Sequence, residues 1–128
     1  METTQQVPPN SSWGHETLAS DELILFYLMN TTEAVIFPRD KRVVLGRATL
    51  DGGINLTPYG AEQDGVSRLH AAVEVQGDLV FLMDLGSTNG TFLNNQRLKP
   101  NHSVQVRSGD QVRLGIMTGY VYFSKLEA

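Results

Sequence analysis

Short apolar runs separated by turn-forming residues fill most of this chain, and this pattern restricts its fold more than any other feature. Clusters such as Asp51-Gly52-Gly53 and Ser108-Gly109-Asp110 stand between the runs and favour turns. The runs have the length of β-strands, and none sustains a helical period. They are Leu23–Met29, Ala34–Phe37, Arg42–Leu45, Ala71–Val75, Leu79–Met83, Val104–Val106, Gln111–Leu114 and Tyr120–Phe123. This spacing predicts an all-β fold, a sandwich of two antiparallel sheets.

Composition limits the size and the chemistry of the protein. The 128 residues suffice for one domain but not for two. The chain has no cysteine, which excludes a disulfide framework, a thiolate zinc site and a cysteine nucleophile. We therefore expect a reducing, cytoplasmic location. The formal net charge of -4 argues against a nucleic-acid partner, and no apolar stretch is long enough to predict a membrane span.

The chain divides into a polar start and a strand-rich remainder. Residues 1–21 contain Pro8-Pro9 and few branched apolar residues, so we expect a flexible N-terminal tail followed by a domain at residues 22–128. A long loop is expected between Ala48 and Val66, because that segment is rich in glycine. Long loops in compact domains are often functional. Tyr59 in this loop either packs on the domain or stacks on a ligand.

The segment Asp84–Thr91 is the most polar loop of the chain. Its Asn89-Gly90 pair stands between the apolar run ending at Met83 and Phe92-Leu93, which is a hairpin-type signal. Glycines such as Gly86 reach backbone angles that strain other residues. Short polar side chains crowd this loop, so it is suited to hold a polar ligand.

Three motifs follow one another along the chain. They are Gly46-Arg47, then Ser67–His70 with the pattern Ser-x-x-His, then Asn89-Gly90. In this order and spacing they resemble the forkhead-associated (FHA) domain, a phosphothreonine-peptide binding module. Leu114-Gly115 resembles the closing strand of that family, so the resemblance covers roughly residues 22–125. It implies an FHA-like β-sandwich with the ligand loops at one end.

The resemblance assigns phosphopeptide binding to five residues, which are Arg47, Ser67, Arg68, Thr88 and Asn89. It implies that Arg47 and Ser67 contact the phosphate and that Arg68 assists them. It also implies that Asn89 holds the peptide backbone beside the phosphothreonine and that Thr88 helps shape the pocket for the threonine methyl group. A phosphothreonine offers roughly -1.5 to -2 charges and three acceptor oxygens. Arg47 offers a guanidinium fork for them, and Ser67 offers a hydroxyl and a backbone N–H.

Each of these residues also has a plainer interpretation. Arg47 can be a solvated surface arginine, and Ser67 can simply close a turn after Gly65. The Thr88 hydroxyl can bond only its own backbone, as turn hydroxyls often do.

Four further residues are expected to support the site without touching the phosphate. Gly46, Gly86 and Gly90 are expected to provide backbone geometry. The resemblance implies that His70 braces the loops by hydrogen bonds. A histidine without a metal-binding or catalytic partner is more often structural, which agrees with this role.

No catalytic constellation accompanies these motifs. We interpret Asp84 and Asp110 as loop-bracing acids, and the three histidines lack metal-ligand spacing. We therefore expect no enzyme activity, no metal and no cofactor. The predicted function is a phosphothreonine-dependent interaction module, an adaptor or regulator in kinase signalling whose partners are kinases or their substrates. A phosphate-independent scaffold on the same sandwich is the alternative.

Thr3 and Thr4 in the tail are possible phosphorylation sites. A phosphorylated tail would be a candidate ligand for the protein's own pocket, where it would block other partners. The alternative is a tail that is simply disordered.

Overall fold

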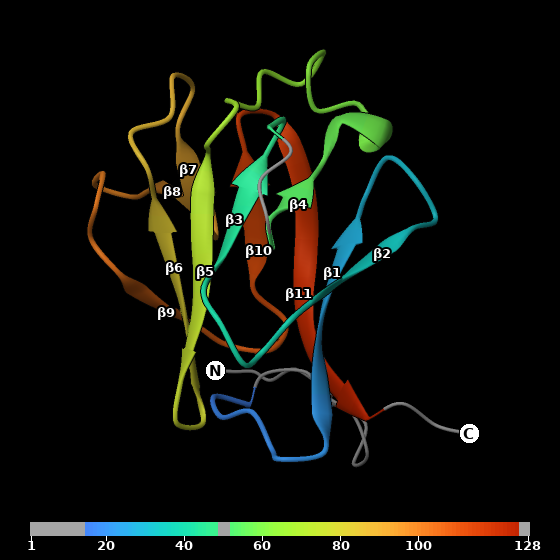
Figure 1. The fold of residues 1–128 in the computed structure, drawn as a ribbon, viewed down its shortest axis with the longest axis vertical. Coiled ribbons are helices and arrows are strands. Elements are labelled where there is room, and N and C mark those ends of the chain that lie inside the picture. Colours follow the sequence, from blue (N-terminus) through green and yellow to red (C-terminus); the bar gives the residue numbers. More distant parts are fainter. Residues whose placement is uncertain (1–14, 49–51, 126–128) are drawn as a thin grey trace, which may run out of the picture.

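Two β-sheets packed face to face form the protein (Figure 1). The computed structural model describes residues 15–48 and 52–125. The six-stranded sheet runs in the order β2 (Ala34–Phe37), β1 (Glu22–Leu28), β11 (Met117–Lys125), β10 (Gln111–Leu114), β7 (Thr91–Leu93) and β8 (Gln96–Arg97). The five-stranded sheet runs in the order β4 (Ile54–Asn55), β3 (Val43–Gly46), β5 (Ala71–Gln76), β6 (Leu79–Asp84) and β9 (Val104–Val106). The predicted all-β sandwich is confirmed.

The predicted apolar runs all form strands, while three short strands were not among the predicted runs. The run Tyr120–Phe123 is the middle of the longer β11. The strands β4, β7 and β8 have only two or three residues each, and β8 consists of exposed polar side chains. The segment expected to be one long loop contains β4 and a turn of 3-10 helix, η1 (Thr57–Tyr59). Within the described residues, no helix is long and apolar enough to cross a membrane.

The segment Asp84–Thr91 does not close a hairpin, so that prediction is wrong. The preceding strand β6 lies in the five-stranded sheet, between β5 and β9. Both of its edges are therefore occupied, and the following strand β7 pairs with β10 and β8 in the other sheet. The segment crosses from one sheet to the other. A second departure is that β3 and β4 pair in parallel, whereas the other strand pairs are antiparallel.

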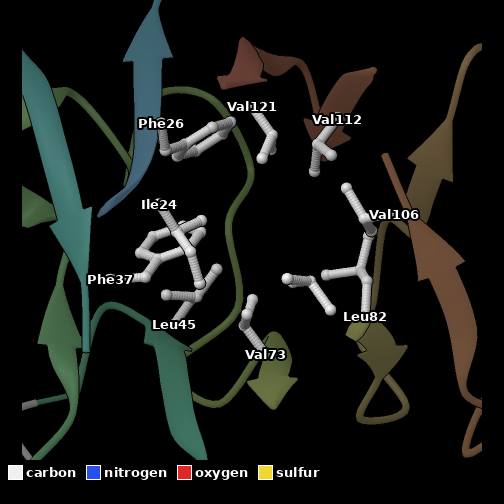
Figure 2. Close-up of a pocket in the computed structure, with 10 residues that line it drawn as sticks. Ile24, Phe26, Phe37, Leu45, Val73, Leu82, Val106, Val112 and Val121 are labelled. Atoms are coloured by element: carbon white, nitrogen blue, oxygen red, sulfur yellow. The ribbon is translucent and has the colours of Figure 1, made fainter. Parts of the chain in front are cut away.

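Alternation along the strands places one face of each sheet in the core. Figure 2 shows side chains from both sheets, such as Phe26 and Val121 from one and Leu45 and Leu82 from the other, pointing toward a shared centre. A cavity of about 10 Å³ lies between them, and its lining is entirely apolar. A water needs about 10–15 Å³ and several polar partners. The cavity is therefore a packing gap rather than a ligand site.

The segment at residues 15–21, which the sequence assigns to the flexible tail, lies against the sandwich. Leu18 is only 1% exposed and belongs to the core, and its N–H donates to the Asp78 carbonyl at 2.7 Å. The His15 carbonyl accepts the Ser108 N–H at 2.9 Å, and the rings of His15 and Phe123 form a T-shaped pair with their centres 5.7 Å apart. The remainder of the predicted tail, residues 1–14, lies outside the described residues.

The loops that carry the sequence motifs gather at one end of the sandwich. Figure 1 shows the end of β3, the segment before β5 and the β6–β7 crossing at the top, while residues 15–21 lie at the bottom. This arrangement matches the expected placement of ligand loops, and it brings segments far apart in sequence side by side.

Gly119 allows β1 and β11 to pack closely, because a Cβ at this position would lie 2.5 Å from Phe26 Cε1 and 2.6 Å from the Tyr27 carbonyl oxygen. We predict that Gly119→Ala lowers the free energy of unfolding by about 1–3 kcal/mol, the usual cost of overpacking. Chemical denaturation measures this change. Ser124→Ala, at a half-buried position of the same strand, serves as the control and should cost much less. Equal stability of Gly119→Ala and the wild type would contradict the prediction.

Candidate functional site

Gly46 brings the end of β3 against the segment before β5. The Arg47 N–H donates to the Ser67 carbonyl at 3.1 Å, and the Ala48 N–H donates to the Arg68 carbonyl at 3.1 Å. A Cβ on Gly46 would lie 2.0 Å from the Arg68 carbonyl oxygen, a distance that no side chain tolerates. Glycine at this position is therefore what allows Arg47 and Ser67 to become neighbours.

His70 connects this segment to the β6–β7 crossing. Its ring is 0% exposed. Nδ1 accepts the Ser67 N–H at 2.9 Å, and Nε2 lies 2.9 Å from the Gly90 carbonyl oxygen. Because Nδ1 accepts and a carbonyl cannot donate, the ring is neutral with its proton on Nε2. Burial lowers the pKa of His70, and the Gly90 carbonyl and the charge of Asp84 offset this only in part. These two hydrogen bonds join the segment before β5 to the β6–β7 crossing, as a residue that braces the loops would do.

Asp84 organises the β6–β7 crossing from inside. Its Oδ2 accepts the N–H groups of Gly86 at 2.9 Å and of Ser87 at 3.2 Å. Its Oδ1 accepts the hydroxyls of Ser87 at 2.5 Å and of Thr91 at 2.7 Å. Burial raises the pKa of Asp84, but these four hydrogen bonds outweigh burial and hold the pKa below its ordinary value. The carboxylate therefore stays charged and braces the loop.

Two glycines let this crossing turn sharply. Gly86 and Gly90 have φ angles of 78° and 92°, in the left-handed region that glycine adopts without strain. The Gly90 N–H donates to the Ser87 hydroxyl at 3.0 Å. We predicted from the sequence that both glycines provide backbone geometry, and both have the positive φ angles that favour glycine.

Ser67, Thr88 and Asn89 meet at the rim of the site. The Thr88 N–H donates to Ser67 Oγ at 3.0 Å, and Asn89 Nδ2 donates to the Gly65 carbonyl at 2.8 Å. Ser67 Oγ thus receives a hydrogen bond and keeps its own proton to donate. The Ser67 N–H, which the sequence offered as a second donor to a ligand, is instead engaged by His70. Thr88 contributes its backbone here.

Two arginines supply positive charge beside this rim. Arg47 Nε donates to the Val66 carbonyl at 2.6 Å, which sets the direction of its half-buried guanidinium. Arg68 is exposed. The sequence-predicted residues therefore lie on adjoining segments. Hydrogen bonds link Ser67 to Arg47 and to Thr88, and the Asn89 side chain bonds Gly65, two residues before Ser67.

A hollow of about 380 Å³ continues from Asn89, and its lining includes Asp64, Arg113 and Ile116. Sequence reasoning named none of these as site residues. The Arg113 guanidinium lies 3.8 Å from the centre of the Phe92 ring, across the β7–β10 pairing that brings the two residues together. This contact depends on the pairing of two strands that are distant in sequence, so no local motif predicts it. Tyr59, for which stacking on a ligand was an alternative, packs against the core.

Thr3 and Thr4 lie outside the described residues. Among the described residues, no cluster of three or more histidine, aspartate or glutamate side chains has the arrangement of a metal site.

The fold and the site define a protein class: the chain belongs to the FHA domain family. The family model, described as "FHA domain", matches residues 43–115. That span contains all five predicted phosphopeptide-binding residues and all four predicted supporting residues.

Known proteins share this region with the chain. Over 55 residues it is 42% identical to protein FraH of Nostoc, which covers 43% of this chain and 19% of FraH. Over 84 residues it is 38% identical to the FHA domain-containing protein FhaB of Mycobacterium tuberculosis, which covers 66% of this chain and 49% of FhaB. The match therefore spans less than half the length of either relative.

Solved structures agree with this assignment. An FHA domain from a structural and functional study of phosphothreonine-dependent FHA domain interactions superposes with a TM-score of 0.63 at 25% identity. The match covers 83% of this chain and 98% of that chain.

The pKa of His70 predicts how stability depends on pH. A lowered pKa means that the folded protein binds fewer protons than the unfolded chain between the lowered value and the ordinary value of 6.5. The contribution of His70 to the free energy of unfolding is therefore fully present above pH 6.5 and is lost as pH decreases through this window. The slope is at most about 1.4 kcal/mol per pH unit. We predict that His70→Gln removes this slope in urea unfolding.

His102→Gln is the matched control, since His102 is exposed, and it should keep the wild-type slope. An unchanged slope in His70→Gln would contradict the assignment. Asp84 adds a second loss of stability below its ordinary pKa of 3.8, since its folded-state pKa is also lowered.

Proposed function

We propose that this chain binds phosphothreonine-containing segments of other proteins through Arg47, Ser67, Arg68, Thr88 and Asn89. The main support is the hydrogen bond of 3.1 Å from the Arg47 N–H to the Ser67 carbonyl. This bond makes the two residues neighbours, so that a guanidinium and a hydroxyl whose proton is available to donate come from adjoining segments. A phosphate needs a fixed positive charge together with hydrogen-bond donors.

Asn89 suits a role in holding the peptide backbone. One Nδ2 hydrogen is used by Gly65, which fixes the plane of the amide. The other Nδ2 hydrogen and Oδ1 supply a donor and an acceptor, the pair that an extended peptide backbone needs. The hollow beside Asn89 leaves room for residues that flank the phosphothreonine.

We propose that the protein works as a non-catalytic adaptor or regulator in kinase signalling. Its partners would be kinases or kinase substrates, in the cytoplasm where both occur. Support comes from the family membership and from the FHA domain structure studied for phosphothreonine-dependent interactions. No cofactor is needed, because recognition relies on charge and hydrogen bonds.

The most direct consequence concerns Arg47. A hydrogen bond to a charged group contributes about 1.5–3 kcal/mol, so Arg47→Ala should weaken binding of a phosphothreonine peptide about tenfold to a hundredfold. Calorimetric titration with a phosphothreonine peptide library and its unphosphorylated twin measures this. Arg42→Ala, at an exposed arginine just before β3, is the control and should bind like the wild type. Equal binding of both libraries by the wild type would instead favour the phosphate-independent scaffold.

We also propose that Thr3 or Thr4, once phosphorylated, competes for the same pocket. Thr4 and His15 are eleven residues apart, a length of at most about 40 Å. The nine-residue β11 spans about 30 Å. The segment at residues 15–21 lies at the end of the sandwich opposite the site (Figure 1), so binding within one chain needs a nearly extended connection.

A peptide of residues 1–10 phosphorylated at Thr4 or at Thr3 should therefore displace a bound phosphothreonine peptide when added separately. The unphosphorylated peptide should not displace it. Absence of competition by either phosphorylated peptide would rule out the tail as a ligand of this pocket.

A further inference from the structure

A groove lies at the lateral edge of the sandwich, and none of the predicted phosphopeptide-binding residues lines it. It forms where β8 ends the six-stranded sheet and β9 ends the five-stranded sheet, strands that Figure 1 shows at the same lateral edge. Its volume is about 490 Å³. This is the size of a site for a few side chains of a peptide.

The floor of the groove is apolar. Leu98 is 9% exposed and belongs to the core, and Leu93 and Val104 pack against it while remaining half-exposed. The Leu98 N–H donates to the Thr91 carbonyl at 2.9 Å, which holds the floor to the start of β7. The floor of the groove is therefore continuous with the core of the domain.

The rim of the groove is basic. Arg97, Lys99 and His102 line it and are exposed, and no lining residue is acidic. This composition contrasts with the chain as a whole, whose formal net charge is -4. Neither Arg97 nor Lys99 forms an ion pair with another described residue. The Arg97 guanidinium lies 5.8 Å from the centre of the Phe92 ring, a contact that leaves its charge without an acidic partner among the described residues. Both exposed cations can therefore meet carboxylates from a partner.

The backbone beside the groove also accommodates an extended segment. Among the described strands, β9 pairs only with β6 and β8 pairs only with β7. Each strand thus has a second edge whose N–H and C=O groups lack a strand partner, and such edges bind extended peptides by adding a strand.

We propose that this groove docks an acidic, extended segment of a partner protein. Side chains alternate between the two faces of an extended chain, so apolar residues would reach Leu93, Leu98 and Val104 while carboxylates meet Arg97 and Lys99. This contact needs no phosphate and goes beyond the proposed phosphothreonine binding.

The groove adjoins the phosphopeptide site, so one partner has a path to both. A Cβ on Gly90 would lie 2.8 Å from Arg97 Nε, and Gly90 directly follows Asn89. A partner that carries both a phosphothreonine and an acidic segment would gain affinity from simultaneous binding.

The test uses two fluorescent peptides, one alternating glutamate with leucine and the other alternating glutamine with leucine. Fluorescence anisotropy with the full chain should show tighter binding of the glutamate peptide, weakening as salt increases. Exposed ion pairs contribute about 0.2–1 kcal/mol each. The double variant Arg97→Gln/Lys99→Gln should therefore bind this peptide roughly fivefold more weakly.

The matched control is Lys41→Gln/Arg42→Gln, which removes two exposed cations on the turn before β3 and should bind the glutamate peptide like the wild type. Arg97→Gln/Lys99→Gln should keep its affinity for a phosphothreonine peptide, which also verifies that it folds. Equal binding of the two fluorescent peptides, or equal loss in both double variants, would overturn the proposal. Tighter binding of a single-stranded oligonucleotide in the groove would also overturn it, since the site would then recognise polyanions.

Discussion

A neutral imidazole buried between two loops is the interaction on which the binding end of this protein depends. His70 accepts the Ser67 N–H with one nitrogen and bonds the Gly90 carbonyl with the other. Because the ring is excluded from water, neither bond has a substitute. A second proton on the ring would set Nδ1–H against the Ser67 N–H, donor against donor. The position of Ser67, and with it the rim of the site, therefore depends on this ring remaining neutral.

Buried polar groups and glycines around His70 prepare the loops before any ligand arrives. The Asp84 carboxylate accepts four hydrogen bonds within its own loop. Gly46 lacks the Cβ that would keep the end of β3 away from the segment of Ser67 and Arg68. The loops thus have little conformational freedom left to lose, which favours affinity. In this account, the exposed groups that recognise a ligand are few, and the buried groups that position them are more numerous.

Sequence reasoning succeeded where residue type and spacing carry the information. The strand runs are short, apolar and bounded by turn-forming residues, and the motif residues from Gly46 to Gly90 lie within the matched family region. It failed where contacts with distant parts of the chain determine strand pairing or burial. The Asn89-Gly90 pair looked like a hairpin, but β5 and β9 occupy both edges of β6. Leu18 stands in a polar segment and yet completes the core. Similarly, the competition between His70 and a ligand for the Ser67 N–H is a tertiary fact that no local pattern contains.

Heteronuclear NMR of the His70 ring nitrogens tests this account most directly, because it observes the proton on which the site depends. The account predicts that Nε2 is protonated and Nδ1 is not, and that this state persists when a phosphothreonine peptide is added. The Ser67 and Arg47 signals should shift at the same time. A proton on Nδ1 of the free protein, or a change of the ring's protonation on binding, would contradict the central role given to the neutral imidazole.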